Sequence, residues 1–209
     1  KYQEADDPVY KLPKNVAAYG GRASVSYKNF LFNGEYAHKI NDPSTINNRI
    51  YKPGNATLLQ FTYATKGMGF YLAAIRTDNM SFKSDRNAEG NDLNINYIPS
   101  LAKQTTYSLP AIYTYGTQPN GEFGMQAQGI YTFKKKSKLG GKYGTTLAMT
   151  YSRYNAIHKA PIDENTPIDS TGTLGYKSDF FKIGKNAYYE NFNFEFSKKF
   201  SKTFKLIVD

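Results

Sequence analysis

The sequence predicts an all-β protein, an antiparallel up-and-down transmembrane β-barrel with about ten strands in these 209 residues. Three observations support this fold class. Most segments alternate apolar and polar residues with a period of two, which is the pattern of a strand with two different faces. Several segments run for about 10 to 13 residues, close to the roughly 9 to 11 with which a tilted strand crosses a bilayer. Short turns and longer loops also alternate along the chain, as they do in outer-membrane barrels.

The first half of the chain is predicted to hold five of these strands. In the first, Tyr19, Val25 and Tyr27 alternate with small or polar residues, and a Lys28-Asn29 turn follows. In the fourth, apolar residues 71–75 occupy both faces, so its faces remain unassigned. The fifth ends at Pro99, because proline cannot donate to a ladder. The predicted ranges are 17–27, 30–39, 56–65, 68–82 and 93–98.

The second half is predicted to hold five more strands. The run 118–121, Gln-Pro-Asn-Gly, contains one of the strongest short hairpin signals. The lysine-rich stretch that ends in Gly140-Gly141 is a predicted turn, and residues 158–182 are a predicted long polar loop. Phe192, Phe194 and Phe196 alternate with polar residues. The predicted ranges are 106–115, 123–133, 143–155, 191–196 and 203–209.

Composition narrows the class of protein. The chain has 19 Tyr and 14 Phe but no Trp and no Cys, and its 16% aromatic content is far above that of disordered segments. No apolar run approaches the ~20 residues of a membrane-spanning helix. Without cysteine there is no disulfide, thiolate metal site or cysteine nucleophile. The net charge of +10 comes largely from lysines in turns rather than along one stripe, so no nucleic-acid partner is expected.

The polar positions of the strands form the candidate site. In a barrel they would face a wet lumen, where charged and amide side chains set the polarity of a pore. Arg22 and Glu35 fall on adjacent strands, where they would either line the pore or form an ion pair. The candidate lumen-lining residues are Arg22, Glu35, Gln60, Gln126, Gln128, Asn191 and Glu195.

No catalytic, cofactor-binding or metal-binding residues are predicted. The chain lacks hydrolase, P-loop and dinucleotide motifs, and its two histidines, His38 and His158, have no partner at metal-ligand spacing. The loop 85–92 carries oxygen ligands at alternate positions, but it lacks the terminal Glu of a calcium loop and contains Arg86. Asx turns are the favoured interpretation there. The acidic residues of loop 158–182 are interpreted as solvated charge.

Several runs give the chain a family resemblance. They are KLPKNVAAYG, GEYAHKINDPS, DNMSFKSDRNAEGNDLNINYIPSLAKQTTYSLPAIY, TQPNGEFGMQAQ and LGGKYGT. With these runs the chain resembles, over its whole length, a poorly characterised family of Bacteroidota outer-membrane barrel proteins. The resemblance implies location in the cell outer membrane and a preceding amino-terminal signal. It also implies that residues 1–209 are a single β-barrel region within a longer barrel. The family has no established activity, so no functional residues are implied.

These observations predict porin-like passage of small hydrophilic solutes by a protein that is not an enzyme and needs no cofactor. Its expected partner is outer-membrane lipid. Two alternatives remain open. One is a non-conducting structural subunit that binds other outer-membrane proteins, and the other is a soluble β-sheet binding protein. A soluble sandwich would rarely need such long strands.

Overall fold

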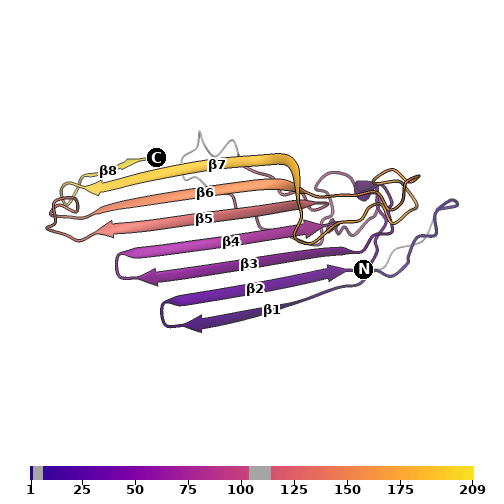
Figure 1. Ribbon diagram of the computed structural model, residues 1–209, viewed down its shortest axis with the longest axis horizontal. Coiled ribbons are helices and arrows are strands. Elements are labelled where there is room, and N and C mark those ends of the chain that lie inside the picture. Colours follow the sequence, from indigo (N-terminus) through magenta and orange to yellow (C-terminus); the bar gives the residue numbers. More distant parts are fainter. Residues whose placement is uncertain (2–6, 104–113) are drawn as a thin grey trace.

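The computed structural model describes residue 1 and residues 7–103 and 114–209, and within these it contains one antiparallel sheet of eight strands (Figure 1). Each strand pairs with the next strand in sequence, so the sheet order is β1 to β8. One short 3-10 helix, Thr45–Asn47, lies among the described residues, where no helix is long and apolar enough to cross a membrane. The strands are β1 (Ala18–Tyr27), β2 (Phe30–Lys39), β3 (Gly54–Thr65), β4 (Met68–Asp78), β5 (Glu122–Phe133), β6 (Thr145–Ile157), β7 (Ile183–Lys199) and β8 (Lys205–Val208).

The structure confirms the all-β, antiparallel up-and-down arrangement and corrects one of the predicted strands. The predicted strand 93–98 is not one, since within it only Asn94 forms an isolated bridge, to Lys83. The predicted strand 106–115 lies mostly outside the described residues. The eight strands form an open sheet with β1 and β8 at its edges, so closure into a barrel stays a prediction.

The connections fall at two different ends of the sheet (Figure 1). The β1–β2, β3–β4, β5–β6 and β7–β8 turns lie at one end, called here the turn end, and the longer connections that follow β2, β4 and β6 leave the sheet at the other, the loop end. At the β3–β4 turn, Gly67 has a φ of 83°, a left-handed conformation that glycine adopts readily. The predicted loop 158–182 is confirmed, because β6 ends at Ile157 and β7 begins at Ile183.

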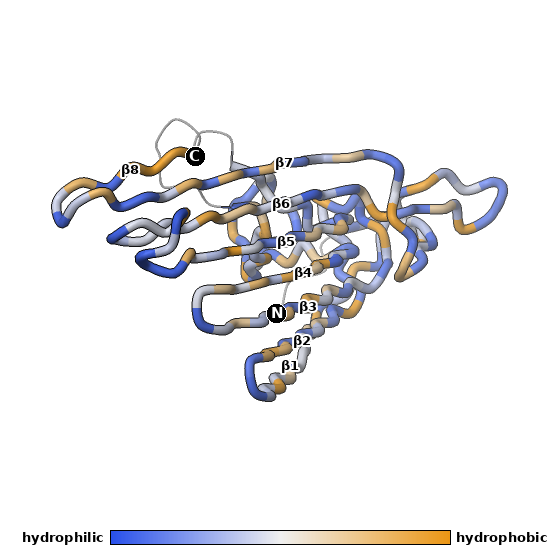
Figure 2. The backbone as a smooth tube through the Cα atoms, turned by 60° about the vertical axis from the view of Figure 1, so that its left-hand side comes forward, coloured by the Kyte–Doolittle hydropathy of each residue, from blue (hydrophilic) through white to orange (hydrophobic). Residues whose placement is uncertain are grey.

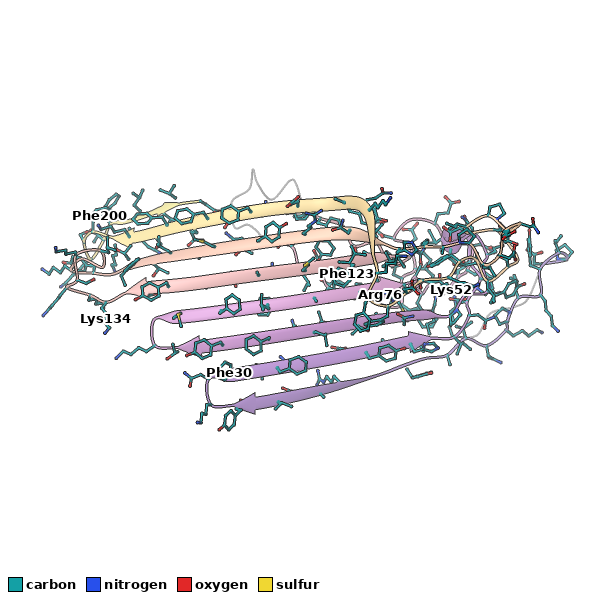
Figure 3. All side chains as sticks on the ribbon, in the orientation of Figure 1. Phe30, Lys52, Arg76, Phe123, Lys134 and Phe200 are labelled. Atoms are coloured by element: carbon teal, nitrogen blue, oxygen red, sulfur yellow. The ribbon has the colours of Figure 1, made fainter. Side chains whose placement is uncertain are left out.

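One face of the sheet, called here the apolar face, is covered by aliphatic and aromatic side chains. The register aligns them in continuous rows across the strands, and much of their surface is exposed. Figure 2 shows hydrophobic and hydrophilic residues in alternation along the strands, and Figure 3 shows rings spread over the sheet from Phe30 to Phe123. One row of register partners consists of Val25, Phe32, Phe61, Leu72, Ala127, Tyr151 and Phe192.

Tyrosines mark both ends of the apolar face. Tyr19 and Tyr36 lie toward the loop end, whereas Tyr27 and Tyr63 lie toward the turn end. Tyr19 and Tyr27 are eight positions apart in β1, which corresponds to about 26 Å along the strand at ~3.3 Å per residue. Outer-membrane barrels likewise have aromatic residues at both edges of their apolar band.

Candidate functional site

The opposite face of the sheet, called here the polar face, carries the predicted site. One row of register partners on it consists of Ser24, Asn33, Gln60, Ala73, Gln126, Ser152 and Asn191. Since side chains two positions apart share a face, this row and its neighbours place all seven predicted residues on the polar face. They are Arg22, Glu35, Gln60, Gln126, Gln128, Asn191 and Glu195.

At the β1 side of the polar face, Arg22 and Glu35 are direct register partners. Together with Asn33 and Gln60 they line a recess of about 550 Å³. The recess therefore offers both signs of charge and amide groups to a hydrated solute.

Cross-strand hydrogen bonds fix the amide side chains in the middle of the polar face. Gln60 Nε2 donates to the Tyr71 hydroxyl at 2.9 Å. Gln126 Nε2 donates to Ser152 Oγ at 3.1 Å, and Gln128 Nε2 donates to Thr150 Oγ1 at 3.3 Å. Each bond joins strands that are neighbours in the sheet, so these amides form an ordered polar surface.

The sequence did not predict that part of the β4–β5 loop lies across the polar face. Residues 98–103, called here the crossing segment, contact it through Leu101, whose N–H donates to the Tyr154 hydroxyl and whose carbonyl accepts from Ser152 Oγ at 3.3 Å. Leu101 also packs with Ala73 and Ile75 in a buried apolar cluster. The signal for this contact was the run of apolar residues on both faces of β4, because Ala73 and Ile75 need an apolar cover on the polar face.

Lys103 brings a positive charge from the crossing segment to the polar face. Its Nζ donates to Asn193 Oδ1 and lies 3.3 Å from Asp209 Oδ1 and 3.9 Å from Glu195 Oε2. The predicted residue Glu195 therefore has a cationic partner that the alternation pattern did not reveal.

Charged residues at the loop end hold the loops to the sheet. Asp78 is buried, and it accepts from Arg76 Nη2 at 3.2 Å and from the Tyr176 hydroxyl at 2.6 Å. Burial raises the pKa of Tyr176 and lowers the pKa of Lys52, whose Nζ lies 3.9 Å from Asp78 (Figure 3). With its hydroxyl kept protonated, Tyr176 is a hydrogen-bond donor that ties loop 158–182 to β4.

The loop that resembles a calcium site is organised by a lysine. Lys83, which is buried, donates to the carbonyls of Gly90 at 2.8 Å and Asp92 at 2.6 Å, and to Asn94 Oδ1 at 2.9 Å. The predicted Asx turn is confirmed, since the Asn87 N–H donates to Asp85 Oδ1 at 2.8 Å. The oxygens of this loop therefore bind an ammonium group of the chain itself.

The acidic residues of loop 158–182 also have local partners. Asp163 accepts from the Thr166 hydroxyl and backbone N–H groups, while Asp169 lies 3.1 Å from Lys159 Nζ. Hydrogen bonds, first of all from the Thr166 side chain, lower the pKa of Asp163. In the part of the chain that the structure describes, no three His, Cys, Asp or Glu side chains gather as metal ligands would.

Comparison with known proteins gives a family and no activity. No curated protein and no protein of solved structure matches the chain. The sequence model of a family described as Family of unknown function (DUF6029) matches residues 1–209. Because this match covers the whole chain, the protein belongs to the DUF6029 family.

Proposed function

We propose that the protein is an outer-membrane β-barrel protein that allows porin-like passage of small hydrophilic solutes, with residues 1–209 forming one region of a longer barrel. The observation that carries the proposal is the division of a single sheet into an apolar and a polar face. The Bacteroidota origin implied by the sequence resemblance belongs to the same proposal.

The apolar face supports lipid as its surroundings. Val25 and Phe192 are 61% and 65% exposed, and Leu59 and Met149, in strands between them, are also exposed. Exposed apolar surface costs roughly 25 cal/mol per Å² in water, and soluble monomers rarely expose contiguous apolar patches larger than a few hundred Å². The charged residues Arg153 and Glu190 on this face are register partners and form an ion pair, with Arg153 Nη1 3.6 Å from Glu190 Oε1. A bilayer would remove the cost of exposing this apolar surface to water.

The polar face supports passage of hydrated solutes. Its amides, its hydroxyls and the recess beside Arg22 and Glu35 offer hydrogen bonds along the strands. The crossing segment narrows the space over this face and places Lys103 within it. Since charged side chains in a constriction bias the sign of the ions that pass, Lys103 and its partners Glu195 and Asp209 are the charges best placed to set ion selectivity.

Planar-bilayer recording of the purified protein tests the proposal. We expect discrete conductance steps, and we expect Lys103→Glu to shift selectivity toward cations. The matched control is Lys134→Glu, which makes the same charge change in the exposed turn between β5 and β6 (Figure 3). Absence of steps from correctly inserted protein would contradict passage.

The crossing segment also supports a second candidate, a non-conducting structural subunit of an outer-membrane complex. Apolar residues of this segment pack against the polar face, so they would occupy part of the interior of a barrel. They are Leu101, Ile98 and Ala102. In this case we expect a stoichiometric companion protein to co-purify from mild detergent, and the recordings to stay silent. Isolation as a lone monomer would contradict this candidate.

A further inference from the structure

We propose that the loop end carries a binding site for neutral oligosaccharides. A cavity of about 840 Å³ lies between residues 81–94 and 116–121 of the β4–β5 connection, the end of β6 and the start of β7. A second cavity, of about 260 Å³, shares Ser81, Asn91, Asn94, Thr117 and Pro119 with it. The two are therefore adjacent, and together they are called here the loop groove. The larger cavity alone is within the roughly 300 to 1,000 Å³ of small-molecule sites.

The lining of the loop groove is rich in amides. An amide side chain has both donors and acceptors, and so does a sugar hydroxyl, so one amide can satisfy a hydroxyl in either role. No carboxylate lines either cavity, within the described residues. The lining amides are Asn91, Asn94, Asn96, Gln118, Asn120 and Asn186.

Two tyrosines complete the chemistry expected for a sugar. Tyr97 lines the smaller cavity and is 82% exposed, and Tyr188 lines the larger one and is 46% exposed. A tyrosine ring offers an apolar surface beside a polar hydroxyl. This combination suits a pyranose, which has apolar C–H faces and a rim of hydroxyls.

Two cationic side chains, Lys159 and the exposed Lys185, line the loop groove, against the six amides. The Nζ of Lys159 lies 3.1 Å from Asp169 and 4.0 Å from the centre of the Tyr176 ring. Its charge is therefore already compensated within the protein. The amides, rather than an array of cations, dominate the lining.

Buried hydrogen bonds hold the walls of the loop groove in place. Lys83 fixes the wall that contains Asn94, as described above. Asn120 joins three segments, since its Nδ2 donates to the Ile46 carbonyl at 3.0 Å and its Oδ1 accepts from the Ser81 N–H at 3.3 Å. A site formed before the ligand arrives loses less entropy on binding.

The inference goes beyond the proposed passage of solutes and does not require it. Binding is measured on purified protein in detergent, where conduction plays no part. Protein that binds sugar but shows no conductance steps would contradict the passage of solutes and support the binding site. Protein that shows conductance steps but binds no sugar would support passage and contradict the binding site.

Isothermal titration calorimetry with maltotriose, cellotriose and xylotriose tests the site. We expect at least one trisaccharide to bind, and we expect Asn186→Ala and Tyr97→Ala each to raise its Kd by about tenfold. Both residues are exposed, so their replacement leaves the fold intact. The control is Asn165→Ala, which removes an exposed amide of loop 158–182 that does not line either cavity, and it should leave Kd unchanged.

Three results would overturn the inference. One is the absence of binding by all three trisaccharides at concentrations up to ~10 mM. Another is a Kd that does not change in Asn186→Ala and Tyr97→Ala, or that rises as much in the control Asn165→Ala as in these two variants. The third is binding of inorganic phosphate alone, which would identify the loop groove as an anion site.

Discussion

Tyr154 shows how one side chain joins the sheet to the loop above it. It is fully buried, its hydroxyl accepts from the Leu101 N–H, and its ring stacks on Tyr115 with centres 4.1 Å apart. Space for the ring comes from Gly124, its register partner in β5, where a Cβ would lie 2.3 Å from Tyr154 Cε1. A large aromatic residue on the polar face is therefore matched by a glycine on the next strand.

We expect Tyr154→Phe to loosen the crossing segment. The change keeps the ring and leaves the buried Leu101 N–H without its acceptor, which costs about 1 to 3 kcal/mol. Hydrogen exchange at the Leu101 amide should become faster. Tyr151→Phe is the control, because the Tyr151 hydroxyl bonds to Glu190 in an exposed position. Equal exchange at Leu101 in all three proteins would show that the hydroxyl does not hold this segment.

Asp163 gives a prediction for pH dependence. Its folded-state pKa is lower than its usual value of 3.8, so its turn is stabilised above pH 3.8 and loses this stabilisation as pH falls through the lower, folded pKa. We expect Thr166→Val to move the pKa of Asp163 back toward 3.8, because the hydroxyl donor is lost. Carboxyl chemical shifts followed by NMR titration measure both values. An Asp163 pKa that stays unchanged in the variant would contradict this account.

The long strands could be predicted from the sequence because a strand with two different faces records its geometry in every second residue. β3 begins at Gly54 and ends at Thr65, against a predicted 56–65. The same signal was misleading at residues 93–98, where Leu93, Ile95 and Tyr97 alternate with polar residues but are largely exposed in a loop. Alternation predicts a strand only where a neighbouring strand completes the ladder, and a local pattern contains no such information.

The sequence predicted which residues of the candidate site share a face of the sheet. Alternation placed Gln126 and Glu195 on the polar face, because a side chain's face follows from its position in the strand. It did not indicate that Lys103 would reach Glu195, since the two are brought together by a loop of the chain rather than by a sheet ladder. Contacts that depend on the path of a long loop have no periodic signal.

Lys83 holds the neighbouring part of the β4–β5 connection in place through its hydrogen bonds to Gly90, Asp92 and Asn94. We expect Lys83→Met to release residues 85–94, because three acceptors lose a buried cationic donor, at a cost of about 3 kcal/mol. Limited proteolysis should then cut in this loop. Lys134→Met, in an exposed turn, should leave the cleavage pattern unchanged. Resistance of the Lys83 variant equal to that of the native protein would argue against this role.

At the scale of the whole molecule, the two faces should respond differently to the same added charge. We expect Leu72→Arg, in the middle of the apolar face, to destabilise the protein in bilayers by about 2 to 4 kcal/mol. Gln126→Arg makes a similar change on the polar face and should cost much less. Urea unfolding in lipid vesicles compares the two variants. Equal destabilisation would count against lipid contact on the apolar face.

The open sheet places a requirement on the proposed barrel. β1 and β8 each have one edge without a neighbouring strand among the described residues. Unpaired backbone groups are not tolerated in the hydrocarbon core of a bilayer. Insertion therefore requires that both edges be paired, either with each other or with further strands from the same chain or from another copy.

The sequential order of the sheet has a consequence for how the protein is assembled. Since every strand pairs only with its neighbours along the chain, each added hairpin finds its partner already in place, and no pairing waits for a distant segment. A chain cut at the turn between β5 and β6 would yield two fragments that meet along one ladder of eleven register pairs, from Phe123–Asn155 to Phe133–Thr145. The order of synthesis is thus also an order in which the sheet can grow, edge by edge.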